Sequence, residues 1–338
     1  MDSVIITGLL AYGMSGKVFH APFLEAHPGF KLHAITERNQ KKAQQDYPAL
    51  ISYNSVDELL DDPAIEMVVI NTPNFSHVDY AKQALLKGKH ILVEKPFAAT
   101  AAEAQEVFDL AKTQGKQVFV FQNRRWDSDF NSVKKVIEAG SLGKLNEVHF
   151  RYDRYRNEIG PKTFKEEPIP ASGLLYDLGP HLLDQAISIF GKPLSYHKIL
   201  GKNRVGTQVD DYFSIHLSYA DSINVFVHAN MLVVDAQPAF VLHGTNGSFI
   251  KDRTDVQEAQ LLKGMKPTDP MYAVEDESMA GILTLIDEEG NKTQSHRSAE
   301  KGKYPELFEA VYASLTQGKA YPVKEEQILW QLEILESK

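Results

Sequence analysis

Asp177 and His181 have the residue types and the spacing that acid–base chemistry requires. In a helix, residues four apart lie on one face, so the carboxylate can orient the imidazole and leave its second nitrogen free. An imidazole held in this way, with a pKa near neutrality, can act as a general base. Asp184, three residues further on, extends the same face. Pro180 suits the first turn of a helix, which places Asp177 near the helix start.

Two other roles stay open for these residues. The side chain of Asp177 is of the kind that caps helices, so Asp177 can be purely structural. A histidine with two carboxylates can also bind a metal ion. One imidazole and two carboxylates are a small ligand set, and we therefore expect no metal.

Lys95 stands in the tripeptide Glu94-Lys95-Pro96, directly after the apolar run Ile91-Leu92-Val93. Ligands of doubly wound sheets bind at the carboxyl ends of the strands, and proline biases Lys95 toward an extended conformation. A lysine at this edge can stabilise negative charge that develops on a substrate oxygen. The alternative is a surface Glu–Lys pair without a chemical role.

The segment from Gly8 to Gly16 lies between the apolar run Val4-Ile5-Ile6 and a stretch of helical character. A buried strand that turns into a helix directs backbone N–H groups and the positive helix end outward, where a dinucleotide pyrophosphate binds. The fingerprint G-x-G-x-x-G is matched at Gly13 and Gly16, while Ala11 replaces the first glycine. A plain strand-to-helix turn is the alternative.

Glu37 and Arg38 follow the second apolar run, about 20 residues beyond the glycines. A carboxylate at this place accepts hydrogen bonds from the ribose hydroxyls of NAD and repels the 2′-phosphate of NADP. An arginine there pairs with that phosphate or stacks on the adenine. On the repulsion argument we favour NAD, with a solvated charge pair as the alternative.

Short apolar runs alternate with helical patterns as far as residue 122. Strands that are apolar on both faces are typical of a parallel sheet covered by helices on both sides, so we predict a doubly wound Rossmann domain over residues 1–122. Residues 123–338 are predicted to form a second α/β domain with an open, largely antiparallel sheet, helices on one face and a mobile loop over 263–293. Its clearest signal is apolar alternation over 213–219 and 223–227, which predicts a hairpin. The predicted strands of the first domain cover 4–6, 32–35, 67–70, 91–93 and 118–121.

Composition narrows the class of protein. The chain has 338 residues, a formal net charge of −9 and no cysteine. The negative charge argues against nucleic-acid binding, which needs a surplus of cations, and the lack of cysteine excludes disulfides and thiol catalysis. No apolar run is long enough to span a membrane, and no basic segment precedes the first run. We therefore expect a cytoplasmic protein with a small-molecule partner, and neither a nucleic acid nor a membrane.

Arginines and aromatic residues gather in two segments, Asn123 to Asp127 and Arg151 to Arg156. Interleaved basic and aromatic residues can bind nucleic acid, but the acidic balance of the chain and the interspersed aspartates argue against it. Hydrogen bonding to a polyhydroxylated or anionic small molecule is the better interpretation. Structural salt bridges are the alternative for most of these arginines.

Taken together, these motifs resemble the Gfo/Idh/MocA oxidoreductases. The loop from Ala11 to Gly16, Glu94-Lys95-Pro96 and Asp177-x-x-x-His181 occur in the order and the domains of that family. Three further segments, Tyr12 to Pro22, Asn123 to Asp127 and Leu175 to His181, resemble the branch that contains scyllo-inositol dehydrogenases. The resemblance extends along nearly the whole chain.

The resemblance implies NAD or NADP held with its nicotinamide over Lys95, and a C-terminal domain whose sheet forms the interface of a homodimer or homotetramer. It also implies that Lys95, Asp177 and His181 lie at the reacting carbon of a polyol or sugar, with His181 transferring the proton. Two other functions remain as alternatives: a reductase of a non-sugar ligand, such as a dihydrodiol or a tetrapyrrole, and a catalytically silent NAD(P)-sensing regulator.

The candidate cofactor-binding residues lie in the phosphate loop, at the carboxyl ends of the predicted strands or just beyond them. They are Ala11, Tyr12, Gly13, Met14, Ser15, Gly16, Thr36, Glu37, Arg38, Asn71, Thr72, Pro73, Asn74, His77, Glu94, Lys95, Asn123 and Trp126. The candidate substrate-binding residues are Lys95, Arg154, Tyr155, Asp177 and His181.

Overall fold

The chain divides into two compact units that alternate along the sequence. The computed structural model describes residues 4–160 and 163–338. The first unit comprises residues up to 123, 257–272 and 303–329, and the second comprises 124–256, 273–302 and 330–338. Each unit is built around one sheet.

The first unit contains a six-stranded sheet in the order β3-β2-β1-β4-β5-β6, and all its strand pairs are parallel. The strand order reverses beside β1, as it does in dinucleotide-binding sheets. This confirms the predicted Rossmann fold. β3 is an addition to the predicted strands, because Ser52 interrupts the apolar run that marks the other strands. The strands are β1 (Ile5–Leu9), β2 (Phe30–Thr36), β3 (Ile51–Tyr53), β4 (Met67–Ile70), β5 (His90–Val93) and β6 (Val118–Val120).

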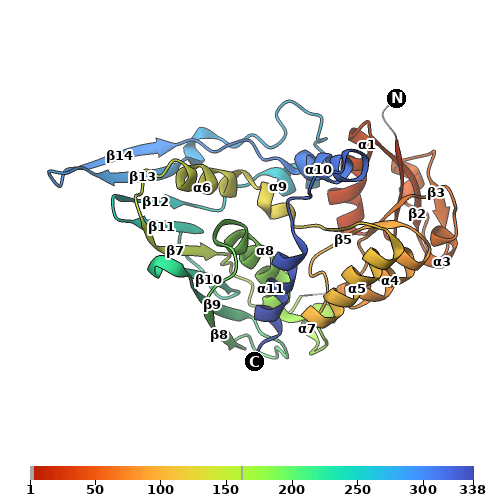
Figure 1. Ribbon diagram of the computed structural model, residues 1–338, viewed down its shortest axis with the longest axis horizontal. Coiled ribbons are helices and arrows are strands. Elements are labelled where there is room, and N and C mark those ends of the chain that lie inside the picture. Colours follow the sequence, from red (N-terminus) through yellow and green to blue (C-terminus); the bar gives the residue numbers. More distant parts are fainter. Residues whose placement is uncertain (1–3, 161–162) are drawn as a thin grey trace. The chain divides into compact units, whose positions relative to one another are not determined.

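Helices cover both faces of this sheet, with α1 and α10 on one side and α4 and α5 on the other (Figure 1). α5 begins at a capping box formed by Thr100 and Glu103 and ends at Gly115, whose φ is +62°. A left-handed residue stops a helix at low cost when it is glycine, as the sequence predicted. The helices are η1 (Gly16–His20), α1 (Ala21–Ala26), α2 (Ala43–Asp46), α3 (Val56–Leu60), η2 (Asn74–Ser76), α4 (His77–Leu86), α5 (Ala101–Gln114), α9 (Gln257–Leu262) and α10 (Tyr304–Gln317).

The first unit extends beyond the predicted boundary at residue 122, because α10 packs onto it. Phe308 of α10 stacks on Phe23 of α1, with ring centroids 5.1 Å apart and planes at 1°. Tyr312, one turn later, contacts His27 and Phe30. Aromatic pairs from distant parts of the chain give no local sequence signal, so the sequence alone could not assign α10 to this unit.

The second unit contains an eight-stranded sheet in the order β14-β13-β12-β11-β7-β10-β9-β8. Its pairs are antiparallel except β7 with β10, so the predicted largely antiparallel sheet is confirmed. In the predicted hairpin, Phe213, Ile215 and Leu217 are fully buried and alternate with partly exposed residues. The strands are β7 (Leu145–Arg151), β8 (Ser195–Gly201), β9 (Tyr212–Ser218), β10 (Asn224–Asn230), β11 (Phe240–Gly244), β12 (Gly247–Lys251), β13 (Gly281–Ile286) and β14 (Lys292–Arg297).

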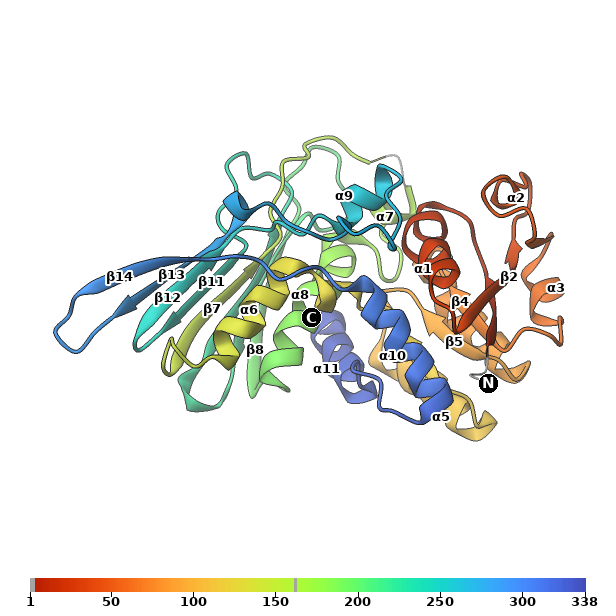
Figure 2. The ribbon, with the colours of Figure 1, turned by 90° about the horizontal axis from the view of Figure 1, so that it is seen from above.

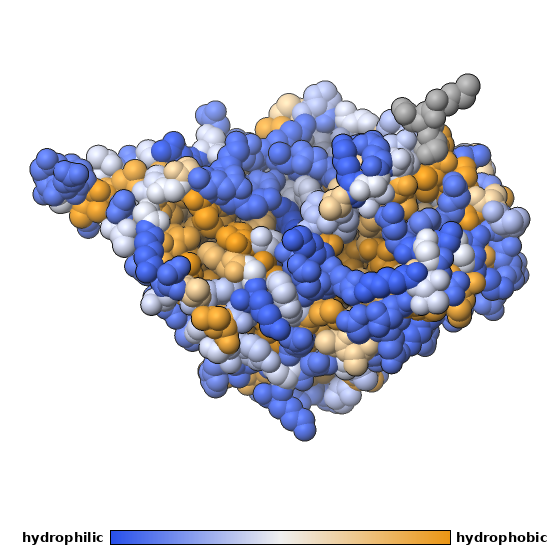
Figure 3. Space-filling model, in the orientation of Figure 1, coloured by the Kyte–Doolittle hydropathy of each residue, from blue (hydrophilic) through white to orange (hydrophobic). Residues whose placement is uncertain are grey.

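The long helices of the second unit lie on one face of its sheet (Figure 2). Hydrophobic residues gather around α6 and α8 on the side seen in Figure 3. The other face carries a ladder of stacked rings, His149, Phe226 and His216, at centroid distances of 4.9 and 4.7 Å. That this face forms an oligomer interface stays a prediction. The helices are η3 (Asn123–Trp126), α6 (Ser128–Glu138), α7 (Thr163–Glu166), α8 (Gly173–Phe190), η4 (Ala220–Ser222), η5 (Glu277–Met279) and α11 (Glu325–Glu336), of which η3 and α11 span a boundary between the units.

The predicted mobile loop over 263–293 is wrong for its second half. Residues 281–286 form β13, which pairs with both β12 and β14. The segment as a whole is rich in acids and prolines, but residues 282–286 are apolar except for Thr284. The hydrogen bonds to β12 and β14 satisfy the backbone groups of this segment. Its short apolar run was overlooked in the sequence because turn residues surround it.

The stack of Phe308 on Phe23 predicts a stability cost. Replacing Phe308 by alanine leaves a cavity beneath α10, and we expect a loss of about 3–5 kcal/mol in the free energy of unfolding, measured by urea denaturation. Phe75 is 59% exposed, and Phe75→Ala is the matched control with a change within about 0.5 kcal/mol. Equal losses in the two variants would contradict the role given to this stack.

Candidate functional site

The phosphate loop is fixed by Asn71, the first residue after β4. The side chain of Asn71 accepts a hydrogen bond from Ala11 N at 3.1 Å and donates one to Ala11 O at 2.8 Å. A Cβ on Gly16 would lie 2.2 Å from Ala11 O, so only glycine fits there, whereas a Cβ on Gly13 would meet nothing within 4 Å. Gly13 thus leaves its backbone open to a ligand. These features fit a dinucleotide pyrophosphate, and the two bonds from Asn71 hold the turn where Ala11 replaces glycine.

Glu94 connects this loop to the end of β5. Its Oε1 accepts hydrogen bonds from the Ser15 hydroxyl and from His20 Nε2, the latter at 2.9 Å, and its Oε2 accepts the Lys95 backbone N–H at 3.2 Å. Burial alone would raise the pKa of Glu94. The hydrogen bond and charge of His20, followed by Ser15, outweigh it and lower that pKa to about 2. Glu94 therefore holds the loop and Lys95 at one edge of the sheet, where the sequence predicted both.

A short π-helical segment brings His20 to Glu94. Residues 16–20 form η1, and the N–H of Ala21 bonds to Gly16 O, five residues back. Pro22 follows and has no N–H to give to the carbonyl four residues earlier, which accounts for the wider turn. His20 is fully buried and packs 4.4 Å from the ring of Phe121. The sequence analysis missed His20, whose only signal was its place in the segment that resembles the family.

His77 ties together the ends of β4 and β5. Its Nδ1 lies 2.8 Å from Pro96 O and its Nε2 lies 2.9 Å from Thr72 O, and the side chain is buried. Thr72 also shares a 2.7 Å hydrogen bond with the Ser76 hydroxyl. Both ring nitrogens of His77 therefore face the protein's own carbonyls. The structure gives this predicted cofactor-binding residue a positioning role at the same edge.

Glu37 lies at the end of β2, where the sequence placed it, but its carboxylate is turned toward its own loop. It accepts hydrogen bonds from Lys42 N at 2.9 Å, from Ala43 N at 3.2 Å and from the Ser52 hydroxyl at 3.0 Å. Glu37 is buried, whereas Arg38 is exposed. The side chain of Glu37 thus orders the start of α2, a contact that sequence spacing does not reveal.

Tyr12 reaches the other end of α2. Its hydroxyl donates to Asp46 at 2.7 Å, and Lys17 Nζ lies 2.8 Å from the same carboxylate oxygen. The hydrogen bond from Lys17, followed by that from Tyr12, lowers the pKa of Asp46. Tyr12, a predicted cofactor-binding residue, therefore joins the phosphate loop to α2.

In the second unit, α8 presents Asp177 and His181 one turn apart. The helix begins at Gly173 rather than near Asp177, so the position predicted from Pro180 is wrong. Asp210, just before β9, supplies the cap: its carbonyl accepts Leu174 N at 2.9 Å and its carboxylate accepts Leu175 N at 2.6 Å. A Cβ on Gly173, where φ is +83°, would lie 2.2 Å from that carboxylate. Because Asp210 lies 35 residues from the helix start that it caps, the sequence around that start does not reveal the cap.

Asp177 is held by two cations. Lys165 Nζ lies 2.6 Å from one carboxylate oxygen and Arg154 Nη2 lies 3.5 Å from the other. His181, on the same helix, is 5% exposed. Of the predicted substrate-binding residues, Arg154 therefore lies next to Asp177. Tyr155 is 59% exposed, and its backbone forms an isolated β-bridge with Leu232. Lys165 was missed, because a lysine in a segment without periodicity gives no signal.

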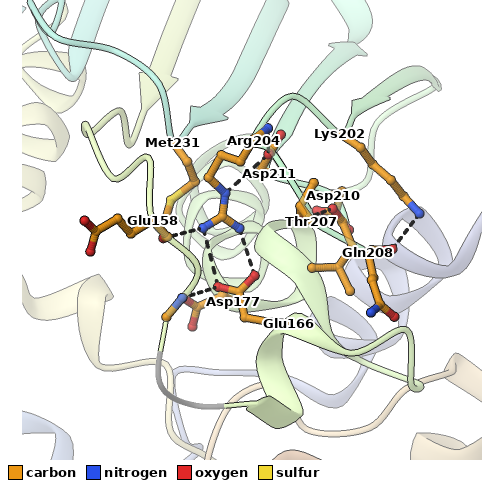
Figure 4. Close-up of polar contacts among 12 residues, drawn as sticks. Glu158, Glu166, Asp177, Lys202, Arg204, Thr207, Gln208, Asp210, Asp211 and Met231 are labelled. Atoms are coloured by element: carbon orange, nitrogen blue, oxygen red, sulfur yellow. Dashed lines mark hydrogen bonds and ion pairs between the residues drawn. The ribbon is translucent and has the colours of Figure 1, made fainter.

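Arg204 fixes the segment that carries Lys165 (Figure 4). Its guanidinium donates to the Glu166 carboxylate at 2.9 Å, to Asp211 at 3.3 Å and to the backbone oxygen of Glu158 at 3.1 Å. Arg204 and Asp211 are buried, so these charges compensate one another away from water. Glu166 also accepts the Gly160 N–H at 3.2 Å. The sequence analysis singled out none of these residues.

Asp184 has a different role from Asp177 and His181. Its two oxygens accept bidentate hydrogen bonds of 2.7 Å from Arg125, and both side chains are buried. Asp184 thus anchors η3, which contains the predicted Trp126, to α8. Within residues 4–160 and 163–338, no group of three or more His, Asp or Glu side chains could hold a metal ion. No helix in this same part of the chain is long and apolar enough to cross a membrane.

The lowered pKa of Glu94 predicts a pH-dependent stability. A carboxyl whose pKa falls from 4.5 to about 2 on folding stabilises the native state above pH 4.5, and this stabilisation is lost as the pH falls toward 2. Glu94→Gln should lower the free energy of unfolding at pH 7 by about 3 kcal/mol, and the difference from the native protein should shrink below pH 4.5. Urea unfolding at several pH values measures both effects.

A matched control exists on the surface. Glu309 also accepts a 2.9 Å contact from a histidine, His27, but its side chain is 59% exposed. Glu309→Gln should change stability little at any pH. A difference between Glu94→Gln and the native protein that stays constant from pH 7 to pH 3 would contradict the assigned ionisation.

Comparison with known proteins places the two units in one family. A family model described as "Oxidoreductase family, NAD-binding Rossmann fold" matches residues 4–122, and the "GFO/IDH/MocA C-terminal domain" matches residues 130–250. The uncharacterized oxidoreductase YdgJ of Escherichia coli is 36% identical, with 99% of this chain and 96% of YdgJ covered. The "scyllo-inositol 2-dehydrogenase (NADP(+)) IolW" of Bacillus subtilis is 33% identical, with 98% and 92% covered.

Solved structures show the same likeness. A protein of Bacteroides fragilis described as an oxidoreductase has a TM-score of 0.90 at 39% identity, over 99% of this chain and 96% of that one. The oxidoreductase yvaA of Bacillus subtilis has a TM-score of 0.95 at 32% identity, over 99% and 95%. With both domain models matched in order and relatives similar along nearly their whole length, the chain belongs to the Gfo/Idh/MocA family of NAD(P)-binding oxidoreductases.

Proposed function

We propose that the protein is an NAD(P)-dependent dehydrogenase that oxidises a hydroxyl group of a polyol or sugar, or reduces the matching carbonyl. The observation that carries the proposal is the Glu94 network, which fixes the phosphate loop and Lys95 at one edge of the sheet. A relative of the same family, IolW, is named a scyllo-inositol dehydrogenase, which supports a cyclic polyol as the substrate class.

In this proposal, side chains of the protein accept one proton and stabilise one developing negative charge. His181 takes the proton of the substrate hydroxyl, and the carboxylate of Asp177 on the same helix face stabilises the imidazolium that forms. The ammonium group of Lys95 stabilises the negative charge on the substrate oxygen. The bound nicotinamide supplies the hydride chemistry. Lys165 and Arg154 position the carboxylate of Asp177. Arg154 also donates a hydrogen bond to a substrate hydroxyl.

The roles of Lys95 and His181 can be tested by substitution. Lys95→Met and His181→Gln should each lower kcat/KM for scyllo-inositol or the best substrate of a polyol panel by about 100-fold, the usual size of an acid–base contribution. Absorbance of the reduced nicotinamide measures the rate. Lys263→Met and His197→Gln change exposed residues of the same types and should leave kcat/KM unchanged.

The same panel distinguishes the alternatives. If kcat/KM of Lys95→Met or His181→Gln fell by no more than threefold, the role assigned to the substituted residue would be refuted. Turnover of a dihydrodiol or a tetrapyrrole but of no polyol would replace the substrate class. Tight nucleotide binding without turnover of any substrate would favour the silent NAD(P)-sensing regulator.

Preference between the two nucleotides depends on Glu37 and Arg38. The negative charge of Glu37 should repel the 2′-phosphate, so we propose NAD(H) as the cofactor. Fluorescence titration should then show tighter binding of NADH than of NADPH, and Glu37→Gln should narrow that difference by about tenfold. Arg38→Ala should leave NADH binding nearly unchanged. Tighter binding of NADPH by the native protein, as the name of IolW would suggest, would refute the repulsion argument and assign the 2′-phosphate to Arg38.

A further inference from the structure

A polar cavity of about 530 Å³ lies in the first unit, at the amino edge of its sheet. Residues at or just before the starts of the parallel strands line it, among them Ile5 of β1, Glu66 before β4, His90 of β5 and Lys116 before β6. Because the strands are parallel, this edge is opposite to the one with the phosphate loop, and a four-residue strand separates the two edges by roughly 13 Å. The cavity is therefore distinct from the cofactor site.

The cavity is rich in positive charge. Lys87, Lys89 and Lys116 line it, and Glu66 is the one acidic residue among its described lining residues. Glu66 is partly engaged, since its carboxylate accepts the Ile6 N–H at 2.9 Å. The residues that line the cavity therefore carry more positive than negative charge, with Asp61 and Asp62 behind two of the lysines.

Two of the lysines have partners within the protein. Lys89 Nζ is buried and donates to Asp62 O at 2.7 Å and to Ile65 O at 2.8 Å. Lys87 pairs with Asp61, and both side chains are more than half exposed. These two lysines contribute charge to the cavity, but their hydrogen-bonding capacity is partly used.

Lys116 and His90 offer donors that the described residues do not use. His90 Nδ1 accepts the Gln117 N–H at 3.0 Å, which places the ring proton of the neutral imidazole on Nε2. Neither His90 Nε2 nor Lys116 Nζ has a partner in the part of the chain that the structure describes, and neither atom is sealed off from solvent. Lys116 runs along Gly88, since a Cβ there would lie 3.9 Å from its Cε. The ammonium group of the partly exposed Lys116 and the imidazole N–H of His90 thus line one cavity without an acceptor among the described residues.

We propose that this cavity is a second ligand site that binds a small, multiply charged oxyanion, such as a phosphate ester, through Lys116 and His90. A volume of this size accommodates a sugar phosphate, and ammonium and imidazole donors match the oxygens of a phosphate group. Asp61 and Asp62 offset much of the charge of Lys87 and Lys89, so the two free donors carry the binding. A ligand at this edge acts on the protein without touching the cofactor or the reacting carbon.

The electrostatics of the site agree with an anion as its occupant. Burial, followed by the positive charge of Lys116, lowers the pKa of His90, while Glu66 opposes them. Burial also lowers the pKa of Lys89, and the charges of Lys116 and Lys87 lower it further, against Asp62 and Asp61. A bound anion would relieve this repulsion between like charges and raise the pKa of His90.

Nuclear magnetic resonance of the full chain with ¹³C-labelled histidine tests the site directly. Inorganic pyrophosphate is titrated at constant ionic strength, and the His90 signal is identified by its loss in His90→Gln. We expect a saturable shift of this signal and a rise in the pKa of His90. Lys116→Ala should raise the dissociation constant about tenfold, because a charged hydrogen bond is lost. Lys263→Ala removes the same charge from an exposed position of the same unit and should leave binding unchanged.

The signal of His90 also separates this site from the cofactor's own pyrophosphate loop, because the two lie at opposite edges of the sheet. A His90 signal that does not saturate below about 10 mM pyrophosphate would overturn the proposal. Equal affinity in Lys116→Ala and the native protein would overturn it as well. Neither result would affect the proposed dehydrogenase activity, which is measured by turnover.

Discussion

The largely buried carboxylate of Glu94, with 13% of its side chain exposed, is the interaction on which the arrangement of the first unit's loop depends. A carboxylate away from water is costly unless donors surround it, and here the donors are the Ser15 hydroxyl, the His20 imidazole and the Lys95 backbone N–H. One donor belongs to the phosphate loop, one to the π-helical turn and one to the end of β5. The position of the loop and the position of Lys95 are therefore set by the same charge. The two hydrogen bonds between Asn71 and Ala11 add to this coupling and hold the turn where Ala11 replaces a glycine.

In the second unit, too, a buried charge positions a candidate site residue, but it acts through intervening side chains. Arg204 satisfies Glu166 and Asp211 at once, and through Glu166 it places Lys165 against Asp177. The bidentate pair of Arg125 and Asp184 anchors η3 to the same helix. Helix α8 is thus held at its start by Asp210 and further along by Asp184. Asp177 and His181 lie one turn apart on the helix held in this way.

The sequence predicted the features that repeat with a period or that only one residue type can satisfy. Continuous apolar runs gave the parallel strands, alternation at Phe213, Ile215 and Leu217 gave the hairpin, and Gly16 marked the close approach to Ala11. Features set by distant partners could not be predicted: the cap that Asp210 gives to α8, the packing of α10 against Phe23, and Lys165. The cap and the packing join segments far apart in the chain, and Lys165 lies in a segment without periodicity. For His77, a candidate cofactor-binding residue, the described contacts are with backbone carbonyls of the protein itself, which the sequence did not indicate.

Glu37 shows how a correct position can carry a different chemistry. Its place after β2 follows the dinucleotide fingerprint, yet its oxygens already accept two backbone N–H groups and the Ser52 hydroxyl. A carboxylate has about four lone-pair sites, so little capacity remains for a ribose hydroxyl unless the loop rearranges. Its charge, however, acts through space and needs no free lone pair. Any preference for NAD at this site therefore arises from repulsion of the 2′-phosphate rather than from recognition of the ribose, and exposed Arg38 is the residue that opposes it.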